Sequence, residues 1–330
     1  MTIKEVARMA GVSPAAVSRY FNGGPLSQEK KKSIAEAIEK TGYRPNLMAQ
    51  TMRTGRIRQI GVIVPRVFSE SVSLILDGVS QELSLRGYLT VIGCSDGDQE
   101  REAQYINILQ DNRVAGIILM ATTLEGPLRE ALLTCKIPVV VTGQWAEEFP
   151  CVYHDDMSAM HDLAQEMIGR GHTRLAYIGV REDDIAAGLL RRMGVQAAMR
   201  EAGLDADRMP YAVSTFDAAC GREKMEELLA QDPQIDGVIC ATDTIALGAM
   251  SALRSRGKRI PEDVALAGLG GGWLNEIPES SLTTVRYEYQ ECGRLAAKML
   301  LSRIENEEAT DSEVKDQIML KYRLIKGDTT

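Results

Sequence analysis

The sequence is poor in the residues from which metal centres and disulfide frameworks are built, and it has no long apolar run. It has three His and six Cys in 330 residues, and no two Cys stand at Cys-x-x-Cys spacing. This predicts single, mostly buried thiols in a reducing compartment. No apolar run reaches the roughly 18 residues that a membrane span requires. The N-terminus also lacks the apolar core of a signal peptide, so we expect a soluble, cytoplasmic protein that does not contact a membrane.

Catalytic signatures are scarce as well. No Ser–His–Asp order or nucleophile elbow stands out, and Gly268-x-Gly270 lacks the third glycine of a dinucleotide fingerprint, because Trp273 occupies that place. The motif His154-Asp155-Asp156 is open to a metal or an acid–base interpretation, but no further His or Cys stands at ligand spacing. A ligand contact or a capping role is favoured for it. We expect no catalytic residue, no metal and no cofactor, and therefore not an enzyme.

The formal net charge of -8 is distributed unevenly along the chain. Residues 1–58 carry 11 Lys and Arg against 4 Asp and Glu, a balance of +7, whereas the remaining 272 residues carry 27 against 42, a balance of -15. A small basic segment on a large acidic body suggests an anionic partner for that segment. An arbitrary run of surface lysines is the alternative at this stage.

The basic segment has the pattern of several short helices. A first helix ends at Gly11, a second is capped by Ser13 and begins with Pro14, and a third is capped by Ser27. Two short helices joined at a glycine turn are typical of a helix-turn-helix, whose second helix enters the major groove of DNA. The candidate base contacts on that helix are Ser13, Pro14, Ala15, Ser18 and Arg19.

The chemistry of these side chains limits what the second helix can read. Arg19 suits a bidentate contact to guanine, and Ala15 can touch a thymine methyl group. Pro14 and Ala15 carry few hydrogen-bonding groups, so few bases would be read directly. A three-helix cluster that packs only for its own stability is the alternative interpretation.

From residue 60 onward the pattern changes to alternating strands and helices. β-Branched apolar runs, typical of buried parallel strands, stand at 60–64, 89–93, 114–120, 137–142, 174–179, 235–241 and 263–268. Amphipathic stretches predict helices at 70–86, 99–111, 157–170, 187–202, 217–231 and 243–256. This predicts an α/β fold of doubly wound parallel sheets, with ligands held at the carboxyl ends of the strands.

A faint internal repeat suggests that this α/β part has two lobes. The strings 114–118 and 235–239 are similar, and each is followed by an Ile-Pro pair and another strand, at 137–138 and 260–261. Two similar lobes would leave a cleft that suits a small ligand. A chance match of short apolar strings is the alternative.

The N-terminal motifs, in this order and at this spacing, resemble the lactose-repressor (LacI/GalR) family: Thr2-Ile3-Lys4-Glu5-Val6-Ala7, Ala10-Gly11-Val12-Ser13, Val17-Ser18-Arg19 and Gly42-Tyr43-Arg44-Pro45-Asn46. The likeness continues through the whole chain, including Gly171-His172 and Ala241-Thr242-Asp243. It implies an all-α helix-turn-helix head over 1–56, with a hinge helix at about 45–53. It also implies a two-lobed, periplasmic-binding-protein-like core over 57–330 that binds an effector and dimerises.

The resemblance implies a second DNA element in the hinge helix, which in this family folds on operator DNA. The candidate contacts are Asn46, Ala49 and Met52, and Met52 stands where the family usually has Leu. An apolar wedge in the minor groove unstacks a base step and kinks the duplex. A segment this short is not a stable helix by itself, so we expect it to order on binding. A plain amphipathic linker is the alternative.

The resemblance also places a set of effector contacts at the lobe interface: Arg66, Ser69, Ser71, Gln144, Arg191, Phe216, Asp243, Trp273 and Tyr287. Acidic residues usual in the family are replaced by Gly143 and by Gly270-Gly271, whereas Arg66 follows the first strand of the core. A planar guanidinium matches a phosphate bidentately, so this site suits an anion better than a neutral sugar. A solvated surface charge is the alternative for Arg66.

Within the family, Arg66 and the stretches 183–192 and 240–244 are similar to the trehalose- and sucrose-type repressors. The resemblance therefore implies a repressor of carbohydrate-utilisation genes that binds double-stranded operator DNA and a small sugar or sugar-phosphate effector. The strand-like tail 318–325 has no heptad repeat, which favours a homodimer over a tetramer. The competing class is an α/β sugar-binding protein or enzyme without DNA function.

Overall fold

The computed structural model describes residues 2–21, 24–43, 58–272, 281–305 and 316–330. The chain divides into two compact units, Met1–Ile57 and Arg58–Thr330. The candidate contacts Asn46, Ala49, Met52 and Trp273, and the hinge helix expected at about 45–53, lie outside the described residues.

The first unit contains three helices, α1 (Ile3–Met9), α2 (Pro14–Phe21) and α3 (Gln28–Thr41). Side-chain caps fix their first turns, as expected: the Ala16 N–H donates to Ser13 Oγ over 3.3 Å, and the Lys30 N–H donates to Ser27 Oγ over 3.4 Å. The helices bury a small shared core: Val6, Ala7, Val17, Ile34 and Ala37.

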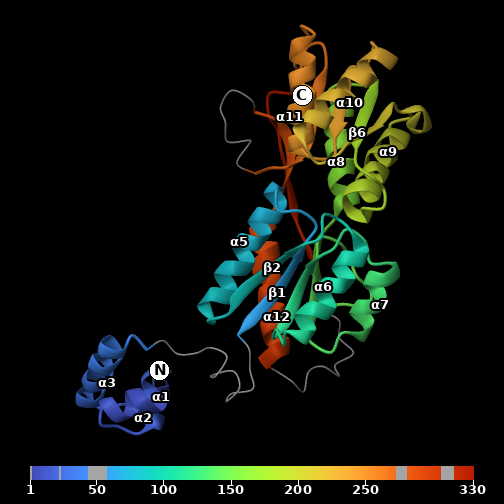
Figure 1. Ribbon diagram of the computed structural model, residues 1–330. Coiled ribbons are helices and arrows are strands. Elements are labelled where there is room, and N and C mark those ends of the chain that lie inside the picture. The colour runs from blue at the N-terminus through green and yellow to red at the C-terminus, as the bar shows by residue number, and fades with distance from the viewer. Residues whose placement is uncertain (1, 22–23, 44–57, 273–280, 306–315) are drawn as a thin grey trace. The chain divides into compact units, whose positions relative to one another are not determined.

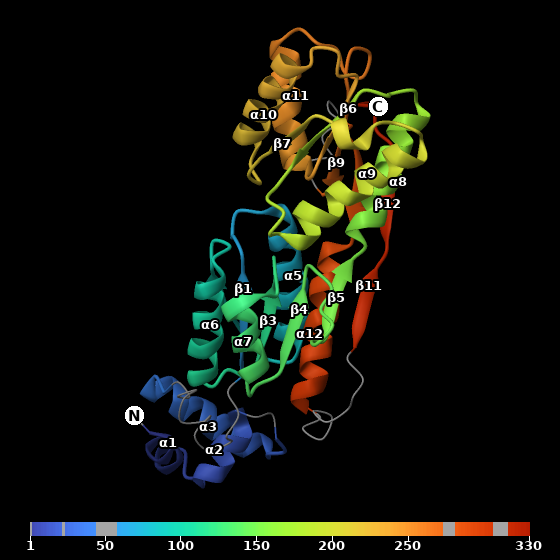
Figure 2. The ribbon, with the colours of Figure 1, turned by 90° about the vertical axis from the view of Figure 1, so that its right-hand side faces the viewer.

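The second unit is built on two six-stranded sheets with matching strand order. Lobe 1 holds the sheet in the order β2 (Leu89–Cys94), β1 (Gln59–Val64), β3 (Gly116–Met120), β4 (Val139–Thr142), β5 (Cys151–His154) and β11 (Gln317–Leu320). Lobe 2 holds β7 (Tyr211–Val213), β6 (Leu175–Gly179), β8 (Gly237–Cys240), β9 (Ala265–Gly270), β10 (Thr283–Tyr287) and β12 (Tyr322–Ile325). Neighbouring strands run parallel except β12, which is antiparallel to β10 (Figures 1 and 2).

This matching order gives the internal repeat a structural counterpart. The two repeated strings run into β3 and β8, which occupy the same place in the two sheets, and the strand after each Ile-Pro pair is β4 or β9. The predicted fold class, two lobes of doubly wound parallel sheet with an all-α head, is confirmed.

Helices cover both sheets. Lobe 1 is packed by α5 (Glu70–Leu85), α6 (Gln99–Asp111), α7 (Gly126–Thr134) and α12 (Tyr289–Glu305). Lobe 2 is packed by α8 (Asp156–Gly169), α9 (Arg191–Glu201), α10 (Ala218–Gln231) and α11 (Asp243–Ser255). Figure 1 shows α5 and α12 side by side, although α12 follows a strand of lobe 2. The chain therefore crosses between lobes after β5, after β10 and between β11 and β12.

One predicted helix and the predicted tail strand take a different form in the structure. The helix expected over 187–202 begins as a π-helix, η1 (Ile185–Leu190), and continues as α9. The tail expected as one strand over 318–325 is two strands, because the chain leaves lobe 1 at Lys321 and joins the sheet of lobe 2.

The structure shows the state of the cysteines and the character of the helices. All six cysteines are free thiols, of which Cys151, Cys240 and Cys292 are buried and the other three are half-buried. Among the described residues, none of the helices combines the length and apolar character needed to cross a membrane.

Candidate functional site

The structure places all five candidate base contacts of the head on or beside α2. Ala16 and Val17 turn into the core of the head, whereas Ser13, Pro14, Ala15 and Arg19 are exposed and Ser18 is half-buried. The 3.6-residue period of the helix separates these two faces. The Arg19 Nε–H donates to the Ala15 carbonyl over 3.4 Å. One face of α2 is thus free of the head's own packing.

Three lysines at the start of α3 extend the positive surface of the head. Lys30, Lys31 and Lys32 are all exposed in the first turns of this helix. Cations at a helix N-terminus oppose the helix dipole, so they do little for the helix itself. They suit the phosphates of a nucleic acid. The sequence analysis included these lysines in the net charge of residues 1–58 but did not name them as candidate contacts. Nothing in their spacing distinguishes them from other surface lysines.

In the second unit, Arg66 contacts a ring from the other lobe. Its guanidinium carbon lies 3.7 Å from the centroid of the Phe216 ring. Arg66 follows β1 in lobe 1, and Phe216 lies between β7 and α10 in lobe 2. Burial lowers the pKa of Arg66, while the charge of Asp184 opposes that shift. The side chain is therefore half-buried between the lobes and is held by an aromatic face.

Arg191 is held by the carboxylate of Asp156, which the sequence analysis named only as part of the motif 154–156. Its Nε–H donates to Asp156 Oδ1 over 2.7 Å, and its Nη1 donates to the Ala241 carbonyl over 2.7 Å. Tyr287 also donates its O–H to Asp156 Oδ1, over 3.1 Å. Burial lowers the pKa of Arg191, but the charge and hydrogen bond of Asp156, together with Tyr287 and Tyr289, outweigh it, so the pKa of Arg191 is raised. The candidates Arg191 and Tyr287 thus share one buried anion.

The motif His154-Asp155-Asp156 divides into three roles. Asp155 caps α8 by accepting the Ser158 N–H over 3.0 Å, and Asp156 pairs with Arg191. The His154 ring lies flat on the Tyr287 ring, with centroids 4.1 Å apart. Burial and the charge of Arg191 lower the pKa of His154 to about 3, so the ring is neutral. The capping role expected for this motif is present at Asp155.

Asp243 is buried and accepts hydrogen bonds from a backbone N–H and a side-chain hydroxyl of its own lobe. Its Oδ2 accepts the Gly271 N–H over 2.7 Å, and its Oδ1 accepts the Thr284 hydroxyl over 2.7 Å. A Cβ added at Gly268 would lie 2.5 Å from Asp243 Oδ1, so the glycine run lets the loop approach the carboxylate. The glycines of Gly268-x-Gly270 therefore allow the backbone to lie close to the Asp243 carboxylate.

Buried polar atoms without partners gather at the carboxyl ends of β4 and β5. Within the described part of the chain, Thr142 Oγ1, Gln144 Nε2 and His154 Nε2 have no hydrogen-bond partner. Thr142 lies opposite Val152 in the paired strands, so Gln144 and His154 follow at the same edge of the sheet. Buried polar groups almost always find a partner, from the protein, a water or a ligand. This edge is therefore the candidate ligand-binding edge of lobe 1.

Ser69 and Ser71 lie on the same side of lobe 1, at the start of α5. Their hydroxyls are 3.0 Å apart and bond to each other. Ser69 precedes α5 but makes no side-chain cap to it. Both side chains are half-buried and retain further hydrogen-bonding capacity.

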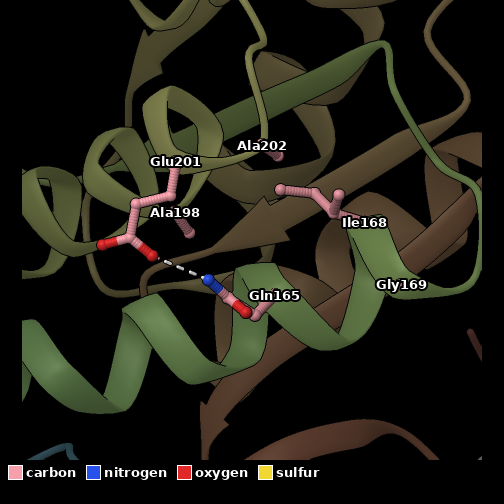
Figure 3. Close-up of a pocket in the computed structure, with 6 residues that line it drawn as sticks. All are labelled: Gln165, Ile168, Gly169, Ala198, Glu201 and Ala202. Atoms are coloured by element: carbon pink, nitrogen blue, oxygen red, sulfur yellow. Dashed lines mark hydrogen bonds between the residues drawn. The ribbon is translucent and has the colours of Figure 1, made fainter.

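A separate groove of about 360 Å³ lies between α8 and α9 (Figure 3). It is lined by Gln165, Ile168, Gly169, Ala198, Glu201 and Ala202. The Gln165 Nε2–H donates to Glu201 Oε2 over 2.9 Å across the groove. None of the candidate effector contacts lines it. No group of His, Cys, Asp or Glu among the described residues is suited to hold a metal ion.

Comparison with known proteins gives two family matches. Residues 2–46 match the bacterial regulatory proteins of the lacI family, and residues 164–330 match a periplasmic binding protein-like domain. The chain is 30% identical over 332 residues to the HTH-type transcriptional regulator RegA of Clostridium saccharobutylicum, covering 100% of this chain and 99% of RegA.

Two further relatives are similar over most of their length. The sucrose operon repressor of Staphylococcus xylosus is 30% identical over 308 residues, which is 92% of this chain and 94% of that protein. The solved complex of the transcriptional regulator CelR with cellobiose superposes with a TM-score of 0.75 at 28% identity, covering 100% of both chains.

Proposed function

Because this chain belongs to the LacI family of bacterial transcriptional regulators, we propose that it represses carbohydrate-utilisation genes under the control of an effector held between its lobes. Family membership makes it a DNA-binding regulator and not an enzyme, as the sequence predicted. It also sets aside the competing class, an α/β protein without DNA function. What we propose beyond family membership is the kind of operator, the class of effector and the residues that bind each of them.

The head binds operator DNA through α2, with Arg19 on a base edge and Ala15 against a thymine methyl. The exposed face of α2 and the lysines of α3 support this arrangement, since one face offers side chains to bases and the neighbouring charges match phosphates. Two copies of the chain as a homodimer would read two half-sites, so the operator is pseudo-palindromic. Asn46, Ala49 and Met52 provide the hinge contacts in the minor groove.

The effector is a disaccharide or its 6-phosphate, bound with Arg66 on the phosphate. The observation that carries this is Arg66 itself: a half-buried guanidinium on the Phe216 ring, without a carboxylate paired to it in the described residues. A guanidinium held in this way is preorganised for an oxyanion. Two relatives support a disaccharide by what they are named for, sucrose in one and cellobiose in the other.

The remaining effector contacts line the same lobe boundary. Gln144 offers an unpartnered amide to a sugar hydroxyl, while Ser69 and Ser71 offer hydroxyls near Arg66. Arg191 and Tyr287 reach the ligand from the buried cluster around Asp156. Asp243, which accepts hydrogen bonds from Gly271 and Thr284, shapes the loop beside the ligand as its contribution to the effector site.

The mechanism is linkage between lobe closure and the head. An effector that binds one arrangement of the lobes more tightly shifts the population toward it. Because the heads of a dimer must span two half-sites, a change in lobe closure changes their separation and the folding of the hinges. Affinity for DNA and affinity for the effector then change by the same factor.

Isothermal titration calorimetry tests the effector assignment. Trehalose 6-phosphate, sucrose 6-phosphate and the free sugars are titrated into the full chain, into Arg66→Ala and into the control Arg129→Ala. Arg129 is an exposed lobe 1 arginine that pairs with Glu148. Tight binding of one sugar phosphate that Arg66→Ala weakens by about tenfold or more and Arg129→Ala retains supports the proposal. Equal binding by Arg66→Ala rejects the phosphate role.

A further inference from the structure

Three consecutive acidic residues after β6 have different surroundings. Glu182 pairs with Arg192 and Asp183 pairs with Arg181. Asp184 forms no ion pair within the described part of the chain; its Oδ1 accepts the Ala187 N–H over 3.0 Å at the start of η1. Asp184 is thus fixed by the backbone rather than by a cation.

The position of Asp184 is set at the boundary between the lobes. The next residue, Ile185, donates its N–H to the Thr122 carbonyl of lobe 1 over 3.0 Å. This bond and the cap to Ala187 leave the Asp184 carboxylate little freedom to move away. The charged groups that act on it electrostatically come from three elements: Arg66 from the loop after β1, Arg191 from α9 and Asp156 from α8. Asp156 is already paired with Arg191, so Arg66 is the cation with charge left to balance.

We propose that Asp184 is a specificity-determining residue, an internal carboxylate that competes with the effector's anionic group for Arg66. The inference rests on the proposed function, in which Arg66 holds a phosphate. Without effector, Asp184 partly balances the charge of Arg66 across the lobe boundary. An incoming phosphate gains the guanidinium but is repelled by the carboxylate. The carboxylate therefore weakens every anion at this site and penalises a neutral sugar little.

This competition depends on pH. Burial raises the pKa of Asp184 to about 6, against the bond from Ala187 and the charges of Arg191 and Arg66, which lower it. Above that pH the carboxylate is charged and opposes the phosphate, and below it the carboxyl is neutral and does not. A phosphate monoester loses its second proton near pH 6 as well, so the wild-type pH profile mixes both effects. The ratio of the affinity of the variant to that of wild type, measured at each pH, separates the two effects.

Calorimetry on the full chain tests the proposal with trehalose 6-phosphate, sucrose 6-phosphate and the free sugars at pH 7.5 and pH 5.0. The variant Asp184→Asn removes the charge and keeps a good helix cap. Asp183→Asn is the matched control one residue away. We expect Asp184→Asn to bind the sugar phosphate about tenfold more tightly than wild type at pH 7.5. At pH 5.0 the two should agree within about twofold, while free-sugar affinity and Asp183→Asn stay at the wild-type values.

The outcomes separate this inference from the proposed function. Phosphate-selective binding by wild type that Asp184→Asn leaves unchanged or weakens at pH 7.5 overturns the role of Asp184 alone. Binding of the free sugars as tightly as their phosphates, or of neither, overturns the phosphate role of Arg66, and the role of Asp184 with it. A thermal melt of Asp184→Asn that matches wild type verifies that its cap and fold are intact. If the melting temperature of Asp184→Asn is lower, Asp184→Glu, which keeps the charge, must retain the wild-type affinity for the sugar phosphate.

Discussion

The guanidinium of Arg66 lies 3.7 Å from the centre of the Phe216 ring, and this contact joins the loop after β1 in lobe 1 to the loop after β7 in lobe 2. A second bond, from the Ile185 N–H to the Thr122 carbonyl, crosses the same boundary. Any ligand that engages Arg66 therefore acts where the lobes meet. That is the position from which ligand binding can change lobe closure.

Removing the charge of Arg66 should distinguish sugar phosphates from free sugars. A hydrogen bond to a charged group contributes about 1.5 to 3 kcal/mol, so Arg66→Ala should weaken a sugar phosphate by roughly tenfold to a hundredfold. The free disaccharide should lose less than about threefold, since it has no anion for the guanidinium. Calorimetry measures both, and an equal loss for the two ligands would indicate a collapsed site rather than a lost phosphate contact.

The buried pair of Arg191 and Asp156 should be costly to break. Asp156→Asn leaves a buried guanidinium without its carboxylate, a change that typically costs about 3 to 5 kcal/mol. The neighbouring Asp155→Asn keeps a good helix cap and should change the free energy of unfolding by only a few tenths of a kcal/mol. Urea denaturation compares the two variants. A loss for Asp156→Asn no larger than that for Asp155→Asn would contradict the buried ion pair.

His154 should make the stability of the protein depend on pH. Its pKa is about 3 in the folded state and about 6.5 in an unfolded chain. The unfolded state therefore binds the proton first, and stability falls as pH drops below 6.5. Between pH 6.5 and 5.5 wild type should lose about 1 kcal/mol more unfolding free energy than His154→Phe, which keeps a ring on Tyr287.

Urea denaturation at the two pH values checks this difference, with His172→Phe as the control for an unrelated histidine. His172 is half-buried outside the Tyr287 stack. An identical pH dependence of wild type and His154→Phe would mean that His154 is not the buried neutral ring described here.

Variants of the head should distinguish side chains that contact bases from side chains that contact phosphates. Arg19→Ala should reduce discrimination between the operator and unrelated DNA, by about 1 to 3 kcal/mol for a lost bidentate contact. Lys31→Ala should weaken both DNAs alike and lower the salt slope by about one. Lys40→Ala, at the far end of α3, is the control. Gel shifts over a series of salt concentrations measure all three, and wild-type behaviour of both Arg19→Ala and Lys31→Ala would contradict the DNA-reading face.

The sequence predicted the central strands and the caps because their signals are local. The runs at 60–64 and 114–120 are apolar on both faces, as buried parallel strands require, and Ser13 and Ser27 precede their helices directly. The helix α12 was not predicted. It carries Gly293, which lowers helix propensity, yet a Cβ there would lie 2.0 Å from the Ile75 carbonyl of α5. That glycine serves a contact between helices far apart in the chain, and such a contact leaves no local pattern.

The candidate site shows the same division. Arg66, Arg191 and Tyr287 were identified from the family resemblance and the ends of strands, where single positions carry the signal. Asp156 and Asp184 were named only within the stretches 154–156 and 183–192. Their coupling to Arg191 and Arg66 was not predicted, because those charges come together only when the lobes are folded. The tail 318–325 is strand-like throughout, and nothing local marks the change of sheet at Lys321.

We propose that the chain binds operator DNA and that an effector bound between its lobes changes this affinity. Fluorescence anisotropy of labelled DNA from the chain's own promoter tests it most directly, with the full chain titrated in the absence and presence of trehalose 6-phosphate or sucrose 6-phosphate. We expect specific binding whose affinity one of these ligands changes by about fivefold or more. In the Arg66→Ala variant, the same ligand should no longer change the affinity for DNA. Failure to bind the promoter DNA under every one of these conditions would contradict this proposal, and so would binding that no sugar or sugar phosphate alters.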